Sequence, residues 1–353
     1  MDLEGLTKTP GEWLKGRGPE SDIVISSRIR LARNIKGYPF VNRASSEQKK
    51  ELWELLSQKI KKTGWPPATK DKELLALNLK EASEIDRVFL VERHLISKEH
   101  AAGHGDRGVV LDNDETLSIM INEEDHLRMQ VMKSGFRIQE IWDEISLLDD
   151  ELERILPFSF HQRYGYLTAC PSNVGTGMRV SVMLHLPALV MTRHIQRVFL
   201  AVQKINFTVR GFYGEGTQAF GDFYQISNQV TLGIREEDIL QSMSEIIPQI
   251  VKYERNIRET LLKDDMTLIE DRVHRAFGML KSARILSSEE AMDLLSAVRM
   301  GINLRILGDV SLDKVNELFL FSQPGHLQKL EQKKLLPMER DILRASFIRN
   351  RLN

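Results

Sequence analysis

Short segments in which apolar and polar residues alternate constrain the fold of this chain more than any other feature of its sequence. The clearest runs from Met178 to Leu186, where five apolar residues alternate with Arg179, Ser181, Met183 and His185. A period of two indicates a strand with one buried and one polar face. Asp22–Arg33 shows the same pattern. Further short apolar segments predict strands at Val88–Val91, Gly108–Leu111, Leu117–Ile121, Tyr164–Cys170 and Ile205–Arg210.

Helical periodicity separates these strands and then dominates the last third of the chain. Ser45 and Gln48 form a capping-box pattern before a helix that ends near Gly64, and Phe136–Leu156 is amphipathic. A further helix is expected through Leu189 and Val202. From Arg235 onward the pattern is helical, with a kink expected at Pro248, caps at Ser287 and Ser311, and breaks at Gly301, Gly308 and Pro324-Gly325. The sequence therefore predicts an α+β domain over residues 1–255 and an all-α domain over residues 256–353.

The balance of charge excludes some classes of partner. Lys and Arg number 49 and Asp and Glu number 50, so the chain as a whole attracts neither nucleic acid nor a membrane surface. Cys170 is the only cysteine, which excludes an intramolecular disulfide and a metal site made of thiolates alone. No apolar run reaches the roughly 18 residues of a membrane span. These features predict a soluble, cytoplasmic protein, and no metal-ligating residue is proposed.

Arginines recur on the polar faces of the predicted strands. They are Arg28, Arg30, Arg179 and Arg210, with Arg128 as a fifth if residues 126–131 are extended. Each could be a solvated strand position, but several on one sheet face would hold a triphosphate through bidentate contacts. The sequence has no G-x-x-x-x-G-K-[ST] loop and none of the elements typical of protein kinases, so a common nucleotide-binding fold is not expected.

Two acidic features and one cysteine loop complete the chemistry. Asn122–Asp125 places three carboxylates in a row after an apolar strand, and Glu215 lies between two glycines in the segment Gly211–Gly221. The first could be an ordinary acidic turn, but two glutamates from separate elements could also clamp a guanidinium group. Cys170 begins a stretch with one proline and two glycines, and a lone cysteine is usually inert core.

Together these segments resemble the phosphagen (guanidino) kinases. The resemblance rests on Cys170–Gly177 followed by Met178-Arg179, on Asn122–Asp125 followed by His126-Leu127-Arg128, and on Ser27–Arg30. It extends from about Asp22 to about Tyr253. It implies a guanidino-kinase-like antiparallel sheet flanked by helices, with ATP and Mg²⁺ as cofactors. The nucleotide-contacting residues implied are Ser26, Ser27, Arg28, Ile29, Arg30, His94, Arg128, Arg179, Val180, Ser181, Val182, Met183, Arg210, Gly211, Phe212, Tyr213 and Gly214.

The resemblance also implies residue roles. Glu124 corresponds to the catalytic carboxylate, Glu215 to the loop carboxylate that grips the guanidinium, and Cys170 to the reactive cysteine beside the substrate. His94 corresponds to a histidine that packs against adenine. Two positions depart from the family pattern: Met183 stands where histidine is common, and Gln225 where aspartate usually precedes Ile-Ser-Asn.

The layout at the two ends indicates the acceptor. Only residues 1–21 precede the first matched strand, where small-molecule guanidino kinases carry a helical domain that closes over the substrate. The helical C-terminal part contains Arg340-Asp341-Ile342-Leu343-Arg344-Ala345. This layout resembles the bacterial protein-arginine kinases, in which Arg340, Asp341, Arg344 and Ala345 would bind phosphoarginine. An ordinary surface ion pair is the alternative for this cluster.

The sequence therefore predicts a kinase that phosphorylates arginine in proteins as part of a stress response. A free-guanidine kinase and a non-catalytic phosphoarginine reader are the alternatives. The family resemblance suggests a heat-shock repressor as a target, a Clp-type protease and an activator protein as partners, allosteric control, and a homo-oligomer.

Overall fold

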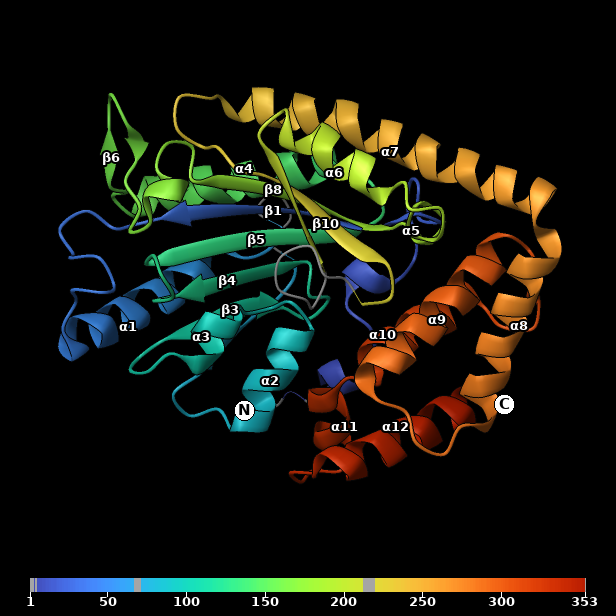
Figure 1. The fold of residues 1–353 in the computed structure, drawn as a ribbon. Coiled ribbons are helices and arrows are strands. Elements are labelled where there is room, and N and C mark those ends of the chain that lie inside the picture. Colours follow the sequence, from blue (N-terminus) through green and yellow to red (C-terminus); the bar gives the residue numbers. More distant parts are fainter. Residues whose placement is uncertain (1–2, 4, 67–70, 212–219, 353) are drawn as a thin grey trace.

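An antiparallel sheet with helices packed on it forms the larger part of the molecule, and a group of helices follows it (Figure 1). The computed structural model describes residues 3, 5–66, 71–211 and 220–352. In that part of the chain the main sheet has eight strands in the order β2-β3-β4-β5-β1-β8-β10-β9, and each neighbouring pair is antiparallel. The prediction of an α+β fold with an antiparallel sheet is confirmed.

The main-sheet strands are β1 (Val24–Arg33), β2 (Leu74–Asn78), β3 (Gly108–Asp112), β4 (Leu117–Ile121), β5 (Leu127–Ser134), β8 (Met178–His185), β9 (Phe207–Gly211) and β10 (Phe223–Asn228). A separate hairpin joins β6 (Phe160–His161) and β7 (Gly165–Tyr166). The helices are α1 (Ser46–Thr63), α2 (Glu84–Glu92), α3 (Lys98–Ala102), α4 (Ile138–Ile155), α5 (Pro187–Met191), α6 (Ile195–Gln203), α7 (Glu236–Asp264), α8 (Met266–Ser282), α9 (Ser288–Asn303), α10 (Leu312–Phe321), α11 (Pro324–Leu330) and α12 (Pro337–Leu352).

The two faces of the sheet differ in chemistry because the side chains of its strands alternate. In central strand β1, Ile29 lies opposite Val131 of β5 and Val180 of β8, and all three are fully buried in one core. α1, α4 and α7 contribute the other side of this core. Arg28 and Arg30 point to the opposite face. The sheet thus has one face for packing and one for chemistry.

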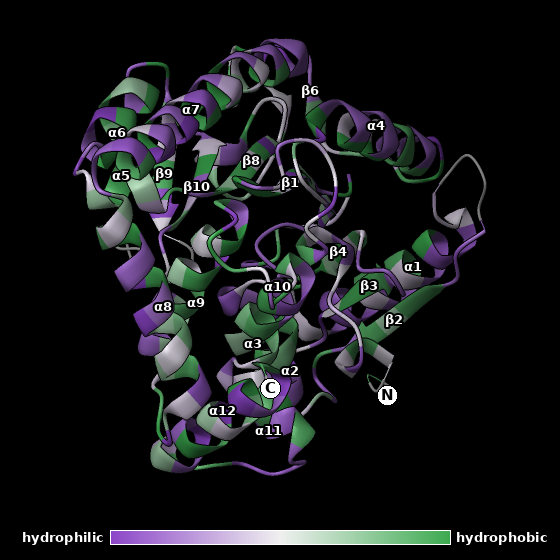
Figure 2. Cartoon of the chain, turned by 90° about the vertical axis from the view of Figure 1, so that its right-hand side faces the viewer, coloured by the Kyte–Doolittle hydropathy of each residue, from purple (hydrophilic) through white to green (hydrophobic). Residues whose placement is uncertain are grey.

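The C-terminal helices have a core of their own that also includes part of the sheet. Val273, Leu295, Phe319 and Ile348 belong to it, together with Trp13, Ile25 and Met183 from the N-terminal segment, β1 and β8. α4 and α7, along the top of Figure 2, alternate hydrophilic purple and hydrophobic green along their length, as amphipathic helices do. None of the helices in the described part of the chain combines the length and the apolar content needed to cross a membrane.

Several sequence-based element predictions are confirmed. Ser45 and Gln48 make both hydrogen bonds of a capping box at α1, Ser287 and Ser311 cap α9 and α10, and the strand at Met178–Leu186 is β8. The strands expected at Gly108–Leu111 and Leu117–Ile121 are β3 and β4.

Other predictions are wrong. Val88–Val91 is not a strand but part of α2, because Ser83 and Asp86 form a capping box that starts a helix there. Only Gly165–Tyr166 of the strand expected at Tyr164–Cys170 is extended in a ladder, and the helix expected through Leu189 and Val202 is divided into α5 and α6.

Gly301 does not break the last helices as expected but lies inside α9. A side-chain Cβ at this position would approach a methyl group of Val273 to 2.3 Å, so the glycine allows α8 and α9 to pack closely. Pro248 lies within α7, which runs on from Glu236 to Asp264. In β1, a shift of register between Val24 and Ser26 turns Ile25 away from the core of Ile29, against the alternation expected from the sequence.

Candidate active site

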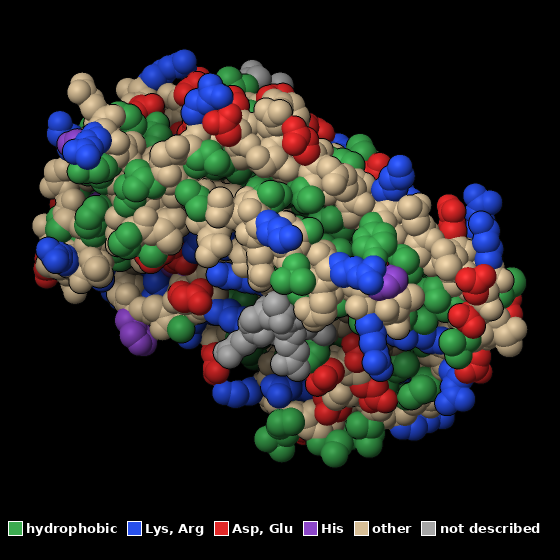
Figure 3. Space-filling view, turned by 45° about the horizontal axis from the view of Figure 1, so that its top comes forward, with side chains coloured by type: hydrophobic (Ala, Val, Ile, Leu, Met, Phe, Trp, Pro, Cys, Tyr) green, Lys and Arg blue, Asp and Glu red, His purple; other side chains and the backbone are tan. Residues whose placement is uncertain are grey.

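The predicted arginines lie on the polar face of adjacent strands. Arg28 and Arg30 come from β1, Arg128 from β5 and Arg179 from β8, and Arg30 lies directly opposite Arg179 in the strand register. Like charges directly opposite one another destabilise a sheet. Figure 3 shows both signs of charge mixed over one face of the molecule, so this concentration of cations is a local feature.

The electrostatics of this cluster favour a bound anion. Burial, and then the neighbouring arginines Arg128 and Arg179, lower the pKa of Arg28 to about 9. Burial followed by Arg210 and Arg128 lowers the pKa of Arg179 to about 10, and the pKa of Arg30 is also well below its usual range for the same kind of reason. A bound polyanion would raise these pKa values again, because it would stabilise the charged guanidinium groups.

The polar face of the sheet that carries these arginines is here called the arginine face. Its hydrogen bonds leave some of the arginine donors available. Arg28 donates from Nε to Ser181 Oγ (3.2 Å) and from Nη2 to Gln225 Oε1 (3.0 Å). Arg179 donates from Nη2 to Ser227 Oγ (3.2 Å). Among the described residues, the buried Nε atoms of Arg30 and Arg179 have no hydrogen-bond partner. Because buried donors are normally satisfied, these two point to a ligand.

The carboxylates of the acidic turn after β4 have different hydrogen-bond partners. Asp125 Oδ1 accepts from Asn34 Nδ2 (2.6 Å) and from the backbone N–H of Ala169 (2.7 Å), so it joins the turn to the cysteine loop. Glu123 Oε1 accepts from Arg128 Nη1 (2.6 Å) and from Ser97 Oγ (2.6 Å). Burial alone would raise the pKa of Glu123, but Arg128 and these hydrogen bonds lower it to about 2.

Glu124 differs from both neighbours. Its side chain is exposed, and its pKa is raised by partial burial, by Asp125 and by Glu123, against smaller opposing effects of Arg128 and a hydrogen bond with Cys170. A carboxylate with a raised pKa and access to solvent is suited to accept a proton. Cys170, at 3.0 Å from Ser172 Oγ, therefore lies beside the candidate base.

A cavity of about 700 Å³ brings Glu124, Arg128 and Arg210 together with Ala169. A second hollow of about 190 Å³ contains Arg179 and shares Arg210 with the first. The candidate base Glu124 and three of the arginines, Arg128, Arg179 and Arg210, thus line two adjoining spaces. A cavity of a few hundred Å³ or more holds a small ligand.

His94 lies at the other end of the arginine face. It contacts Trp13 edge to face (4.9 Å between ring centroids), and Gln130 Nε2 donates to its backbone oxygen (2.6 Å). Burial, followed by Arg28 and Arg30, lowers its pKa to about 3, so the ring is neutral. The space among Trp13, Ser26, His94 and Met183 is only about 10 Å³. The purine ring of a nucleotide could therefore enter it only by displacing a side chain. No sequence pattern points to Trp13, because it lies before the first predicted strand.

Four of the predicted nucleotide residues do not present side chains to this face. Ile29, Val180 and Val182 are fully buried in the core on the opposite side of the sheet, and Ser27 Oγ donates to Gly135 O (2.8 Å). Phe212, Tyr213, Gly214 and Glu215 lie outside the described residues. Gly211 ends β9 next to Arg210.

The C-terminal cluster lies in α12 and is largely built into the helical core. Arg344, only 1% exposed, donates from Nε to Ser322 O (2.8 Å) and from Nη1 to Leu286 O (2.7 Å) and to Asp341 Oδ1 (2.6 Å). Ala345 is fully buried, whereas Arg340 is half-buried. Asp341 and Arg340 are therefore the members that can reach a ligand most directly.

No group of His, Cys, Asp and Glu side chains in the described part of the chain is arranged to hold a metal ion. Glu123 and Asp125 already have arginine, serine, amide or backbone partners. The donor set fits an ion such as Mg²⁺ only if phosphate oxygens and water supply most of its ligands, which is how Mg²⁺ usually binds with nucleotides.

Comparisons with known proteins agree with this arrangement. Residues 56–257 match the model of the ATP:guanido phosphotransferase C-terminal catalytic domain, and residues 266–353 match that of the protein-arginine kinase McsB C-terminal domain. The chain is 47% identical to a protein-arginine kinase of Halothermothrix orenii, over 100% of both chains. It is 45% identical to one of Desulforamulus reducens, covering 100% of this chain and 99% of the relative.

Solved structures of guanidino kinases share the fold. A lombricine kinase crystal structure matches with a TM-score of 0.59 at 24% identity, over 71% of this chain and 73% of that one. A duplicated taurocyamine kinase of Schistosoma mansoni with bound transition-state analogue components matches with a TM-score of 0.60 at 25% identity, over 76% of this chain and 38% of that one.

Proposed function

The chain belongs to the ATP:guanido phosphotransferases, as an ATP-dependent kinase of the protein-arginine kinase branch, and from this we propose how its residues divide the reaction. The γ-phosphoryl group of ATP passes to a terminal guanidinium nitrogen of a protein arginine. An N–P bond forms, the bond from phosphorus to the β–γ bridging oxygen breaks, and ADP leaves. The nitrogen gives up one proton.

Glu124 accepts that proton. The observation that carries this proposal is that Glu124 is the exposed carboxylate of its turn, has a raised pKa, and opens on the same cavity as Arg128 and Arg210. A guanidinium group has a pKa above about 12 and is a poor nucleophile while protonated. A base placed at the nitrogen therefore lowers the barrier as the N–P bond forms.

The arginine face holds the phosphates. Arg28, Arg30, Arg128, Arg179 and Arg210 neutralise charge on the transferring group, as cations do in phosphoryl transfer generally. When bound with the nucleotide, Mg²⁺ would supply further neutralisation of charge on the phosphate oxygens, with water and those oxygens as most of its ligands. His94 and Met183 line the purine end, where Trp13 would have to move.

Two further residues handle the acceptor. Glu215, outside the described residues, holds a second guanidinium nitrogen in the proposed mechanism, so that two carboxylates fix the planar group. Cys170, hydrogen-bonded to Glu124, orients the carboxylate and the entering guanidinium. It forms no covalent intermediate.

Regulation and partners follow from the same reading. Arg340, Asp341, Arg344 and Ala345 form the proposed phosphoarginine site, in which the aspartate faces guanidinium nitrogens and arginines face phosphoryl oxygens. Binding there would give allosteric control by the product. We place the enzyme in a cytoplasmic stress response, as a homo-oligomer that marks proteins such as a heat-shock repressor and works with an activator protein and a Clp-type protease.

The test compares acceptors. The full chain is incubated with Mg²⁺ and ATP plus either free arginine or a folded, arginine-rich protein, and acid-labile phosphate is measured on each. Transfer to the protein at a much higher kcat/KM than to free arginine supports the proposal. Preference for free arginine would make the chain a small-molecule guanidino kinase, and no transfer to either would make it a phosphoarginine reader.

A further inference from the structure

One face of α9 carries a polar stripe that the proposed mechanism does not use. Asp293, Ser296, Arg299 and Asn303 follow one another at intervals of three, three and four residues, so they lie along one side of the helix. Ser296 and Arg299 are fully buried. This stripe, here called the α9 stripe, faces the ends of the catalytic sheet strands.

Two of its members belong to a hydrogen-bond chain whose direction is fixed by chemistry. Arg299 Nη1 lies 2.8 Å from His185 Nδ1, and a guanidinium group can only donate, so Nδ1 accepts. The proton of the neutral His185 ring is therefore on Nε2, which donates to Ser296 Oγ at 2.8 Å. Ser296 then donates to Asp222 Oδ2 at 3.1 Å. Burial, followed by Arg299 and Arg258, lowers the pKa of His185 well below its usual range and keeps the ring neutral.

The backbone on both sides of Asp222 is held by the stripe and by Leu186, the residue after β8. Asp293 Oδ1 accepts from the N–H of Gly221 at 2.9 Å, and Leu186 N–H donates to Asp222 O at 3.0 Å. Gly221 has a φ of +64°, and a Cβ there would lie 2.9 Å from Met292 O of α9. Only glycine permits this close approach. Gly221 and Asp222 are thus fixed between the end of β8 and α9.

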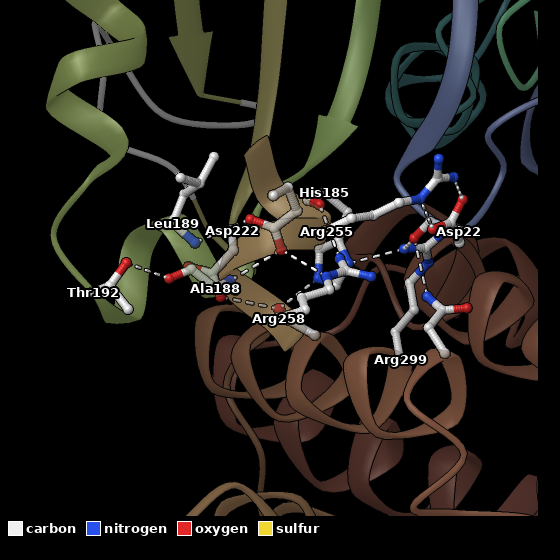
Figure 4. A network of polar contacts seen from close by, with 12 residues as sticks. Asp22, His185, Ala188, Leu189, Thr192, Asp222, Arg255, Arg258 and Arg299 are labelled. Atoms are coloured by element: carbon white, nitrogen blue, oxygen red, sulfur yellow. Dashed lines mark hydrogen bonds and ion pairs between the residues drawn. The ribbon is translucent and has the colours of Figure 1, made fainter. Parts of the chain in front are cut away.

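The other end of the stripe holds the entrance to β1. Arg299 donates from Nη2 to Ser21 O (2.7 Å) and from Nη1 to Asp22 O (2.9 Å), and Asn303 Nδ2 donates to Asp22 O (3.0 Å). Figure 4 shows Arg299, Asp22, His185 and Asp222 in one network at the junction of the sheet and the C-terminal helices. Buried networks of this kind hold a single arrangement when all members are satisfied.

We infer that the α9 stripe consists of positioning residues for phosphoryl transfer, supplied by the C-terminal helices to the catalytic sheet. Ser21 and Asp22 lead into the strand of Arg28 and Arg30, and Gly221 and Asp222 lead into the strand of Gln225, which accepts from Arg28. Gly221 also follows Glu215 in the sequence. The inference rests on the proposed function of these residues, and it assigns the helical region a part in the geometry of the active site.

The test uses three variants of the full chain. Asp293→Ala removes the acceptor of the Gly221 N–H, Asp293→Asn keeps a carbonyl oxygen in its place, and Glu289→Ala removes an equal charge from an exposed position on the same helix. Asp293 is itself exposed, so its loss leaves no hole in the core. The measurements are kcat, the KM for ATP, nucleotide binding, and hydrogen exchange of peptides that contain residues 220–226.

We expect Asp293→Ala to lower kcat by about tenfold to a hundredfold, because small misplacements of reacting groups have effects of this size. The KM for ATP stays within about twofold, and exchange at residues 220–226 becomes faster. Asp293→Asn restores most of kcat, and Glu289→Ala behaves like the parent. Unchanged kcat and exchange in Asp293→Ala, or an equal loss in Asp293→Asn, would overturn the inference.

Ser296→Ala provides a second test inside the network, since it interrupts the hydrogen bonds from His185 to Asp222 with a small change of volume. The same fall in kcat and faster exchange are expected, and parental values of both would refute the role of the stripe. Exchange and nucleotide binding need no turnover. Hydrogen exchange and nucleotide binding therefore report on positioning even if the acceptor is not a protein arginine. The assay that compares free arginine with a folded protein tests the acceptor separately.

Discussion

Replacing Arg30 by Met tests whether the arginine face lowers the stability of the free protein while it raises the affinity for ATP. Arg30 lies opposite Arg179, its Nε is buried and, among the described residues, without a hydrogen-bond partner, and its pKa is lowered by burial and by three neighbouring arginines. Without nucleotide this side chain destabilises the fold. An unsatisfied buried donor costs about 1–3 kcal/mol.

Arg30→Met is therefore expected to raise the free energy of unfolding of the free protein by about 1–3 kcal/mol, seen as an increase in Tm of about 2–5 °C. ATP binding should change in the opposite direction. Loss of one charge-assisted phosphate contact, at about 1.5–3 kcal/mol, raises the Kd for ATP by roughly tenfold to 150-fold. Thermal denaturation with and without ATP, and calorimetric titration, measure the two effects.

Arg154→Met is the matched control. Arg154 is exposed on α4 and pairs with Glu151 three residues before it, at 3.3 Å. Exposed pairs contribute about 0–1 kcal/mol, so neither Tm nor ATP affinity should move appreciably. A decrease in Tm of Arg30→Met without nucleotide, or an unchanged Kd for ATP, would refute the account of the arginine face.

Three further predictions concern the proposed base and the C-terminal cluster. Glu124→Gln should lower kcat by at least about a hundredfold while ATP still binds, and steady-state kinetics with a binding titration check it; substantial turnover would remove Glu124 from the mechanism. Since the pKa of Glu124 is raised, the wild-type rate should fall with decreasing pH at a higher pH than an ordinary glutamate gives, because the protonated form cannot accept a proton; the pH profile of kcat/KM shows this limb. Asp341→Ala should destabilise the fold by about 1–3 kcal/mol, because the buried Arg344 loses its carboxylate partner, and should abolish stimulation by phosphoarginine without changing ATP affinity; full stimulation would reduce the cluster to a structural ion pair.

The alternation in the sequence predicts several strands of the sheet and the arginines on their polar faces, whereas β2 and β10 are not predicted and the antiparallel sheet is what the family resemblance implies. In β8 and β1 most residues on both faces are buried, but one face packs apolar side chains into the core and the other carries arginine and serine, and this difference leaves a strong signal in the sequence. The sequence of Val88–Val91 does not distinguish a strand from a helix, because a short apolar run fits both, and the deciding signal, Ser83 with Asp86, lies before it. The bulge that turns Ile25 over has no sequence signature of its own.

Long-range contacts are what the sequence could not predict. Trp13 packs beside His94, and Arg299 reaches the backbone of Ser21 across most of the chain. No local sequence pattern points to either contact. Likewise, the tail cluster reads as an exposed pair at helical spacing, but the structure buries Arg344 against backbone carbonyls of Leu286 and Ser322.

The most direct test of the central claim identifies the atom that receives the phosphoryl group. A folded, arginine-containing protein is phosphorylated by the wild-type chain and by Glu124→Gln, kept at neutral pH, and examined by ³¹P NMR and by mass spectrometry of its peptides. The account predicts acid-labile phosphate on arginine side chains with the wild-type chain and almost none with the variant. Acid-stable phosphate on hydroxyl side chains, or equal labelling by both proteins, would contradict it.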